Sequence, residues 1–400
     1  MRIRRVGILT AGGIAPCLSA AVGSLILGYA ERDPAVEILC YRHGYAGLLL
    51  GDSIVVTGEV RSGAERLLHF GGSAIGNSRV RLENREDCIR RGLVRPGQDP
   101  QIVATERIVA DGIDVLHTIG GDDTSAVAAE LAKVLEKNGH GLAVVGLPKT
   151  IDNDIQPIVK TLGADTAADE SAKFFTHIAN ECTTSPRMLI VHEIMGRNCG
   201  WLTAEAALRY RSWLGRQQLL PSIGLARERW DLHGVYLPEL AWDLANEGRR
   251  LANVMDAVGN VNIFVAEGAG AKNVLEEMEK DGIKIPRDAF GHAQLDRINL
   301  GQWLGERLAK VVGAAKVLVQ KSGYFARSAA PNAEDSRLIR ETVHLAIDSA
   351  FRGLSGVVGC SQEMNGQLSL IPFDRIRGGR KFDPTIGPFA ELLRSIGQLS

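Results

Sequence analysis

The sequence predicts an α/β protein with two lobes, each built on a mostly parallel sheet with helices on both faces. Three observations support this prediction. Apolar runs rich in β-branched residues alternate with longer segments of helical periodicity, as in parallel sheets. A chain of 400 residues is too long for one ordinary core. Glycine-rich or charged tripeptides follow several of the apolar runs, at the strand ends where such sheets bind ligands.

The predicted strands are short apolar runs, and the predicted helices separate them. Strands are expected at 6–10, 36–41, 113–119, 142–147, 188–194, 261–266 and 317–320. Helices are expected at 15–32, 124–137, 165–180, 200–210 and 338–351, with Thr124 as the N-cap of the second.

The sequence contains no clean linker, so we expect the two lobes to exchange chain segments. One lobe should comprise residues 1–160, completed by about 325–370, and the other residues 161–324, completed by about 371–400. A basic, turn-rich stretch occurs near the end of the chain, at 375–381.

Composition excludes several classes of protein. The chain is 45% hydrophobic and 23% charged with a formal net charge of −1, so it has no basic field for nucleic acid or for an anionic membrane. No apolar run is long enough for a transmembrane helix. The basic and then apolar start is expected to be a buried strand, because a double glycine interrupts it too early for a signal peptide. Six scattered cysteines without a CxxC pair indicate reduced thiols in the cytoplasm.

Two glycine-rich loops are candidate anion sites. Gly12 and Gly13 follow the first predicted strand and precede a helix, so backbone N–H groups and the helix dipole can face an anion. A simple turn is the alternative for this pair. The loop at 71–79 ends in Arg79, which suggests a phosphate clamp, with an ordinary surface loop as the alternative.

The segment 120–124 reads GGDDT at the end of a predicted strand. Gly121 allows a phosphate to approach closely, and Asp122 can hold Mg²⁺, usually through water. A capped helix with solvated carboxylates is the alternative.

The segment 148–154, PKTIDND, is the candidate for catalysis. It combines a cation, a hydroxyl and two carboxylates, which are the groups that phosphoryl transfer needs to accept a proton, offset charge and hold metal. A turn rich in Asx residues is the alternative. The presence of GGDD upstream and of MGR at 195–197 favours catalysis.

Taken together, these segments resemble the phosphofructokinase family. The first loop, the loop ending at Arg79, GGDD, PKTIDND, MGR, Glu267 and the run at 323–327 follow the family's order, and they cover most of the chain. The resemblance implies two Rossmann-like lobes and Mg²⁺-dependent transfer of a phosphoryl group to the 1-hydroxyl of fructose 6-phosphate. It also implies a homo-oligomer, either a dimer or a tetramer.

The resemblance assigns roles residue by residue. Asp152 matches the catalytic base, Asp122 the magnesium aspartate and Asp154 an acid beside the metal. The donor phosphates are assigned to Gly12, Gly13, Arg79 and Gly121. The sugar phosphate is assigned to Thr150, Ile151, Asp152, Met195, Gly196, Arg197, Glu267, Tyr324 and Arg327.

Two further catalytic candidates, Asp123 and Lys149, indicate the donor. ATP-using members of the family usually carry Gly where this chain has Asp123, whose carboxylate would occupy and repel the place of the α-phosphate of ATP. Lys149 resembles the pyrophosphate-dependent subgroup, and its ammonium can neutralise a compact pyrophosphate. The pair favours pyrophosphate, with an ATP-dependent enzyme and a non-catalytic sugar-phosphate sensor as alternatives.

The chain departs from the family at a few positions. Cys17 stands where the first loop usually has Gly, either as a buried small residue or as a reactive thiol. Met188 stands at a usual Arg, with Arg187 beside it, and Lys316 or Lys321 would have to replace another Arg. These differences admit sedoheptulose 7-phosphate as a second acceptor.

Overall fold

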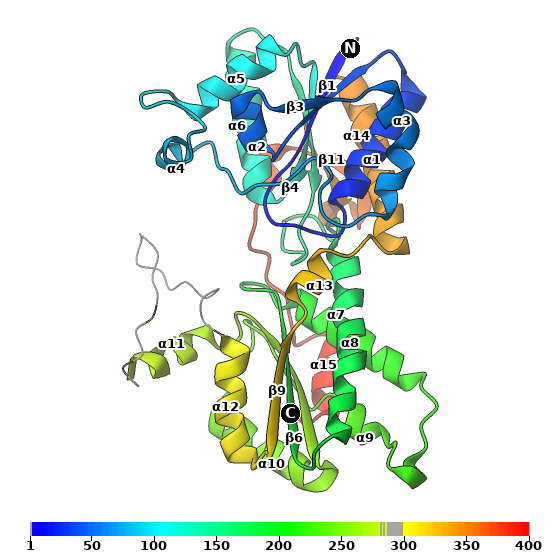
Figure 1. The fold of residues 1–400 in the computed structure, drawn as a ribbon, viewed down its shortest axis with the longest axis vertical. Coiled ribbons are helices and arrows are strands. Elements are labelled where there is room, and N and C mark those ends of the chain that lie inside the picture. The colour runs from blue at the N-terminus through cyan, green and yellow to red at the C-terminus, as the bar shows by residue number, and fades with distance from the viewer. Residues whose placement is uncertain (1, 281, 283–284, 286–298, 400) are drawn as a thin grey trace. The chain divides into compact units, whose positions relative to one another are not determined.

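The computed structural model describes residues 2–280, 282, 285 and 299–399, and the chain forms two units within it (Figure 1). The first unit comprises Met1–Ala167 and Arg327–Arg380, and the second comprises Ala168–Ala326 and Lys381–Ser400. The chain therefore passes from one unit to the other three times.

The first unit is organised around a seven-stranded sheet of order β11-β10-β5-β4-β1-β2-β3. The five inner strands are parallel, whereas β3 and β11 are antiparallel edges. The strands are β1 (Arg5–Thr10), β2 (Glu37–Tyr41), β3 (Ser53–Val55), β4 (Val115–Gly120), β5 (Ala143–Pro148), β10 (Gly356–Ser361) and β11 (Gln367–Ile371). The inner strands β4 and β5 are buried throughout, as expected where helices cover both faces.

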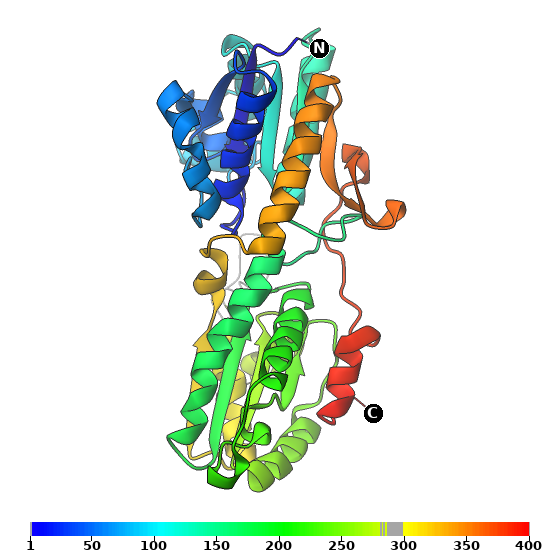
Figure 2. The ribbon, with the colours of Figure 1, turned by 90° about the vertical axis from the view of Figure 1, so that its right-hand side faces the viewer.

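Helices cover both faces of this sheet. In the two ribbon views α1 lies beside α14 on one face, while α2, α5 and α6 lie on the other (Figures 1 and 2). The helices are α1 (Leu18–Arg32), α2 (Tyr45–Leu50), α3 (Gly58–Gly63), α4 (Arg85–Arg90), α5 (Pro100–Ala110), α6 (Asp122–Lys137) and α14 (Ala333–Phe351). Short 3-10 turns occur at Ala64–His69, Gln362–Met364 and Phe373–Arg375.

The second unit contains a four-stranded, fully parallel sheet of order β7-β8-β6-β9. Its strands are β6 (Met188–Ile194), β7 (Gly234–Tyr236), β8 (Asn260–Ala266) and β9 (Lys316–Lys321). Its core lies between this sheet and α10 and α12, and α8 packs against α15. The remaining helical segments are α7 (Ala164–Ile178), α8 (Trp201–Gly215), α9 (Arg227–Trp230), α10 (Leu244–Val258), α11 (Ala271–Lys280), α12 (Leu300–Val312), α13 (Gly323–Arg327), α15 (Gly387–Ser395), and 3-10 turns at Ala179–Thr183 and Pro221–Ile223.

The predicted fold class is confirmed, and each predicted strand is present within two residues of its expected bounds. The N-cap prediction at Thr124 was wrong. The helix α6 begins at Asp122 with Gly121 as its N-cap, and the side chain of Thr124 is buried. Asp122 and Asp123 occupy the first turn because the positive end of the helix dipole favours carboxylates there.

Candidate active site

The first loop, which follows β1, is held in place by the loop at 71–79. The backbone N–H of Gly12 donates to the carbonyl of Ser78 (2.9 Å), and the side-chain amide of Asn77 donates to the carbonyl of Gly12 (2.7 Å). Gly12 has a φ of +92°, and a side chain there would also meet the ammonium of Lys149 at 2.8 Å. Only glycine therefore fits this position.

Three cations converge on the neighbouring residue, Gly13. The Lys149 ammonium donates to the Gly13 carbonyl (2.8 Å). A Cβ added to Gly13 would lie 2.7 Å from Nη1 of Arg327 and 3.4 Å from Nη2 of Arg79. We call Lys149, Arg79 and Arg327 the cation group. Converging cations of this kind suit an anion that carries several charged oxygens.

Lys149 is the buried member of the cation group, with a side chain that is only 4% exposed. Its pKa is lowered to about 8, mainly by burial and also by the charges of Arg327 and Arg79, whereas Cys17 and Asp152 act in the opposite direction. An ammonium held in this way gains stability from any anion that arrives beside it.

The candidate catalytic loop, residues 149–155, is fixed by hydrogen bonds within itself and to Thr161. We refer to it below as the catalytic loop. The hydroxyl of Thr150 accepts the backbone N–H of Asp152 (3.2 Å) and donates to Asp154 (3.3 Å). Asn153 has a φ of +51°, and its side-chain oxygen accepts the backbone N–H of Thr161 (3.1 Å). The Thr161 hydroxyl in turn donates to the Thr150 carbonyl (2.8 Å). Asn153 and Thr161 thus set the course of the loop, although neither was predicted as a site residue.

Two carboxylates, those of Asp122 and Asp154, are the candidate metal ligands. Asp122 is the first residue of α6 at the end of β4. Burial raises the pKa of Asp154, the charge of Asp122 raises it further, and the bond from Thr150 opposes both. The described residues hold no cluster of three or more His, Cys, Asp and Glu side chains suited to a metal. Two carboxylates nevertheless fit Mg²⁺, which takes one or two of them and completes its shell with phosphate oxygens and water.

Asp123, the next residue of α6, forms an exposed ion pair with Arg81. The sequence had suggested a carboxylate that would repel the α-phosphate of a nucleotide. Arg81 offsets part of the charge of this carboxylate.

In the second unit, the MGR segment and Glu267 meet at the carboxyl ends of β6 and β8. The backbone N–H of Glu267 donates to the carbonyl at the end of β6 (2.9 Å). A side chain at Gly268 would overlap the carbonyl of Arg197, so the two turns touch through their backbones. Gly196 has a φ of +124°, and a Cβ there would lie 2.6 Å from the carbonyl of Cys199.

Met195 connects this pair of turns to α13. A Cβ added to Gly323, the first residue of α13, would lie 3.5 Å from the Met195 sulfur. Tyr324 follows with a side chain that is 82% exposed. The second unit thus brings Met195, Gly196, Arg197, Glu267 and Tyr324 to one end of its sheet.

The residues at which the chain departs from the family pattern have internal roles. Arg187 donates to the carbonyls of Gly313 (2.7 Å) and Val312 (2.6 Å) at the end of α12. Lys321 donates to Glu193 (2.7 Å), and Lys316 lies 3.4 Å from Glu181.

Cys17 is fully buried, and burial raises its pKa above the ordinary thiol value. The reading of Cys17 as a buried small residue is confirmed.

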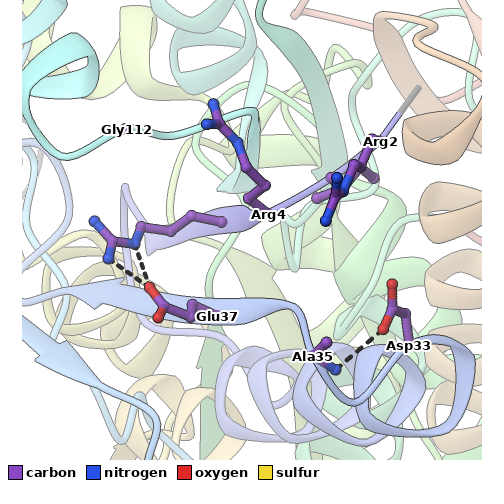
Figure 3. A pocket seen from close by; sticks show the side chains of 8 residues that line it. Arg2, Arg4, Asp33, Ala35, Glu37 and Gly112 are labelled. Carbon is purple, nitrogen blue, oxygen red and sulfur yellow. Dashed lines mark hydrogen bonds and ion pairs between the residues drawn. The ribbon is translucent and has the colours of Figure 1, made fainter.

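A separate cavity of about 420 Å³ lies at the opposite, amino end of the seven-stranded sheet (Figure 3). Its lining includes Arg4 and Arg5, but these arginines already face carboxylates. Arg5 donates to Glu37 (Nε, 2.8 Å), and Arg4 donates to Asp114 (Nη2, 3.3 Å). The cavity is therefore a poor anion site.

The sheets and strand-end loops define an α/β protein with two parallel-sheet units, and the sequence comparison assigns its family. The family model described as "Phosphofructokinase" matches residues 5–349, and the chain belongs to that family. No described helix is both long and apolar enough to cross a membrane.

Individual relatives are similar over nearly their whole length. The chain is 56% identical to the pyrophosphate–fructose 6-phosphate 1-phosphotransferase of Methylotuvimicrobium alcaliphilum, covering 99% of this chain and 97% of the relative. It is 52% identical to the enzyme of the same name from Propionibacterium freudenreichii, covering 99% and 98%. The crystal structure of a pyrophosphate-dependent phosphofructokinase from Marinobacter aquaeolei has the same fold, with a TM-score of 0.72 at 18% identity over 98% of this chain and 91% of that one.

Proposed function

We propose that the protein transfers a phosphoryl group from pyrophosphate to the 1-hydroxyl of fructose 6-phosphate, yielding fructose 1,6-bisphosphate and phosphate. The reaction is reversible and serves glycolysis and gluconeogenesis. Relatives with more than half of their residues identical to this chain carry the corresponding name.

The observation that carries the choice of donor is the cation group around the first loop. Lys149, Arg79 and Arg327 approach the backbone of Gly13 from different parts of the first unit. Pyrophosphate lacks a nucleoside that would anchor it, so its binding energy must come from charge neutralisation at its phosphates. The ion pair of Asp123 with Arg81 at the start of α6 supports the exclusion of a longer donor.

The proposed base is Asp152 in the catalytic loop. Its carboxylate accepts the proton of the 1-hydroxyl as that oxygen bonds to phosphorus, while the bridging P–O bond of pyrophosphate breaks and phosphate leaves. Thr150 holds the backbone of Asp152, and Lys149 offsets the charge of the departing phosphate. In the reverse direction the protonated carboxyl returns the proton to the sugar oxygen.

Asp122, together with Asp154, would hold Mg²⁺ beside the donor. A bound Mg²⁺ supplies charge neutralisation at the phosphate oxygens. These residues supply two carboxylates in a site where burial and mutual repulsion favour a cation.

The residues that the resemblance assigns to the sugar phosphate are found in each unit separately. Thr150 and Ile151 contribute from the first unit, and Met195, Gly196, Arg197, Glu267 and Tyr324 contribute from the second. Arg327 belongs to the sugar-phosphate set by its resemblance and to the donor loop by its contact with Gly13. We keep its assignment to the sugar's 6-phosphate, and its guanidinium also lies beside the donor loop at Gly13.

A coupled assay of fructose 1,6-bisphosphate formation tests the proposal, with Mg²⁺ and either pyrophosphate or ATP as the donor. We expect turnover with pyrophosphate and little with ATP. Turnover with ATP alone would contradict the assigned donor, and no turnover with either donor would contradict the assigned activity. Asp152→Ala should reduce kcat by about 10²–10⁴-fold, the usual contribution of a general base, and near-full turnover would exclude Asp152 as the base.

Assembly and location are also proposed. We expect a homo-oligomer, a dimer or a tetramer, which light scattering of the purified protein would measure. The cysteines of the chain are all free thiols, which favours the cytoplasm.

A further inference from the structure

The basic stretch near the end of the chain lies along the catalytic loop of the first unit. We define residues 376–380 as the strap. Gln156 and Arg377 exchange backbone hydrogen bonds in both directions (2.7 and 3.1 Å), and the N–H of Arg380 donates to the carbonyl of Asp154 (2.9 Å). More than two hundred residues of sequence separate the strap from the loop that it contacts.

The side chain of Arg380 adds a second set of contacts to the loop. Its Nη1 donates to the carbonyl of Ile158 (2.7 Å), and its Nη2 donates to the carbonyl of Asn153. Asn153 lies between Asp152 and Asp154 and has a φ of +51°. One guanidinium thus joins the unusual backbone turn of the catalytic loop to the segment that follows it.

At Gly378 the backbone of the strap contacts Asp122, the candidate metal ligand. A Cβ at Gly378 would overlap the Asp122 carboxylate, so the two groups touch only because residue 378 has no side chain. Gly378 is not among the residues with positive φ. Its backbone would therefore accept alanine without conformational strain, and the obstacle to a side chain there is the contact with Asp122.

We propose that the strap is a positioning element of the reaction centre, in which Arg380 fixes the catalytic loop and Gly378 sets the place of the Asp122 carboxylate. Arg380 and Gly378 act through Asp152 and Asp122, so both are positioning residues. The roles of those two aspartates rest on the proposed function, whereas the physical coupling of the strap to the loop can be measured without turnover.

Arg380→Ala tests the first half of the proposal, with Arg375→Ala as the matched control. Arg375 is an exposed residue of the same basic stretch and pairs with Glu363, away from the catalytic loop. In hydrogen exchange, Arg380→Ala should speed exchange of the amides at 153–158, and Arg375→Ala should leave them unchanged. Equal exchange in the two variants would overturn the proposal, whatever their activity.

Turnover measurements on the same variants distinguish a role of Arg380 in positioning the catalytic loop from a general loss of protein stability. A displaced catalytic group lowers kcat, by about 10–100-fold for shifts near 1 Å, with a smaller change in the KM for either substrate. Arg380→Lys keeps the charge but lacks the guanidinium that donates to two carbonyls. Its kcat should therefore lie between those of wild type and Arg380→Ala. A fall in soluble yield with unchanged kcat per folded molecule would mean that Arg380 stabilises the fold only.

Gly378→Ala tests the second half through the metal. We expect the Mg²⁺ concentration for half-maximal velocity to rise about tenfold, the lower end of losses on changing a partner of a metal ligand, with most of the velocity recovered at high Mg²⁺. Electron paramagnetic resonance of Mn²⁺ with pyrophosphate and no sugar should show the same loss of affinity without turnover. Unchanged Mn²⁺ affinity would overturn this half. A wild-type protein that is inactive with pyrophosphate would contradict the proposed function, while the exchange experiment would still decide the role of the strap.

Discussion

Among the single residues, Lys149 holds a charge where burial disfavours it. Its pKa of about 8 lies below the ordinary 10.5. The unfolded chain therefore binds more protons between these two values, and the contribution of Lys149 to the free energy of unfolding rises with pH through that window. Perturbed pKa values of this kind cluster at functional sites, which supports the proposed role of Lys149 at the donor.

The alkaline limb of activity should depend on this lysine. Since the charged form neutralises the donor, kcat/KM for pyrophosphate should fall as pH rises through about 8, the pKa of Lys149 in the free enzyme. Lys149→Arg keeps its charge to higher pH and should shift this limb upward, even if its maximum is lower. The titration of pyrophosphate itself is common to both enzymes and cancels in the comparison. If wild type and Lys149→Arg lost activity over the same alkaline range, Lys149 would not be the group that causes the loss.

Substitution of Asp123 tests whether this residue selects pyrophosphate over ATP as the donor. Asp123→Gly removes both the carboxylate and its exposed ion pair with Arg81, so kcat/KM for ATP should increase by about tenfold or more, which corresponds to roughly 1.4 kcal/mol of removed repulsion. Asp123→Asn keeps the shape without the charge and separates the two causes of exclusion. If neither variant gained activity with ATP, the donor would have to be selected elsewhere.

Candidate site residues next to a strand end could be proposed from the sequence, whereas residues that contact the site from distant segments could not. Gly12, Lys149 and Asp122 each stand beside a predicted strand, and the chemistry of their side chains suggests a ligand. The roles of Gly378 and Arg380 depend on contacts with segments far away in the sequence, which no local pattern encodes.

At the scale of elements, Asp335 joins the N-termini of α7 and α14. Its fully buried carboxylate accepts the N–H of Gly163 (3.0 Å) and both the N–H and hydroxyl of Thr166 (2.8 and 2.5 Å). A Cβ at Gly163 would lie 3.3 Å from the sulfur of Cys17, so this junction also supports the first loop. Burial raises the pKa of Asp335, and the hydrogen bonds that it accepts oppose that change.

Asp335→Ala should lower the free energy of unfolding by about 3 kcal/mol, because it leaves buried donors without an acceptor. Urea unfolding measures the effect. The control is Glu334→Gln, an exposed neighbour paired with Arg337, which should change stability little. Equal stabilities of the two variants would show that the donors of α7 find other acceptors.

Strands that coincide with a long apolar run could be predicted from the sequence, whereas short or half-exposed strands could not. The buried strand at 188–194 has the bounds that its apolar run predicts. The strands β3 and β7 have three residues each, and β11 is a half-exposed antiparallel edge, so none of them shows a long apolar run. The helices α10 and α12, which lie between predicted strands, were not predicted either.

At the scale of the whole molecule, the assigned donor and sugar residues divide between the two units. Pyrophosphate with Mg²⁺ should therefore slow hydrogen exchange in the first unit, at 12–19, 71–79 and 149–155. Fructose 6-phosphate should also slow exchange at 195–199 and 267–268 of the second unit. Protection by pyrophosphate confined to the second unit would reverse the assignment of the lobes.

The passage of the chain between units has a consequence for synthesis on the ribosome. Strand β5 ends at Pro148, while its neighbour β10 begins only at Gly356. At 5–20 residues per second, the roughly 200 intervening residues take about 10–40 s to emerge, and during this time one side of β5 has no partner strand. The strap emerges later still, so a chain that is released early lacks the segment that holds its catalytic loop. We therefore expect a chain that stops before residue 376 to lack the hydrogen bonds that the strap makes with residues 153–158.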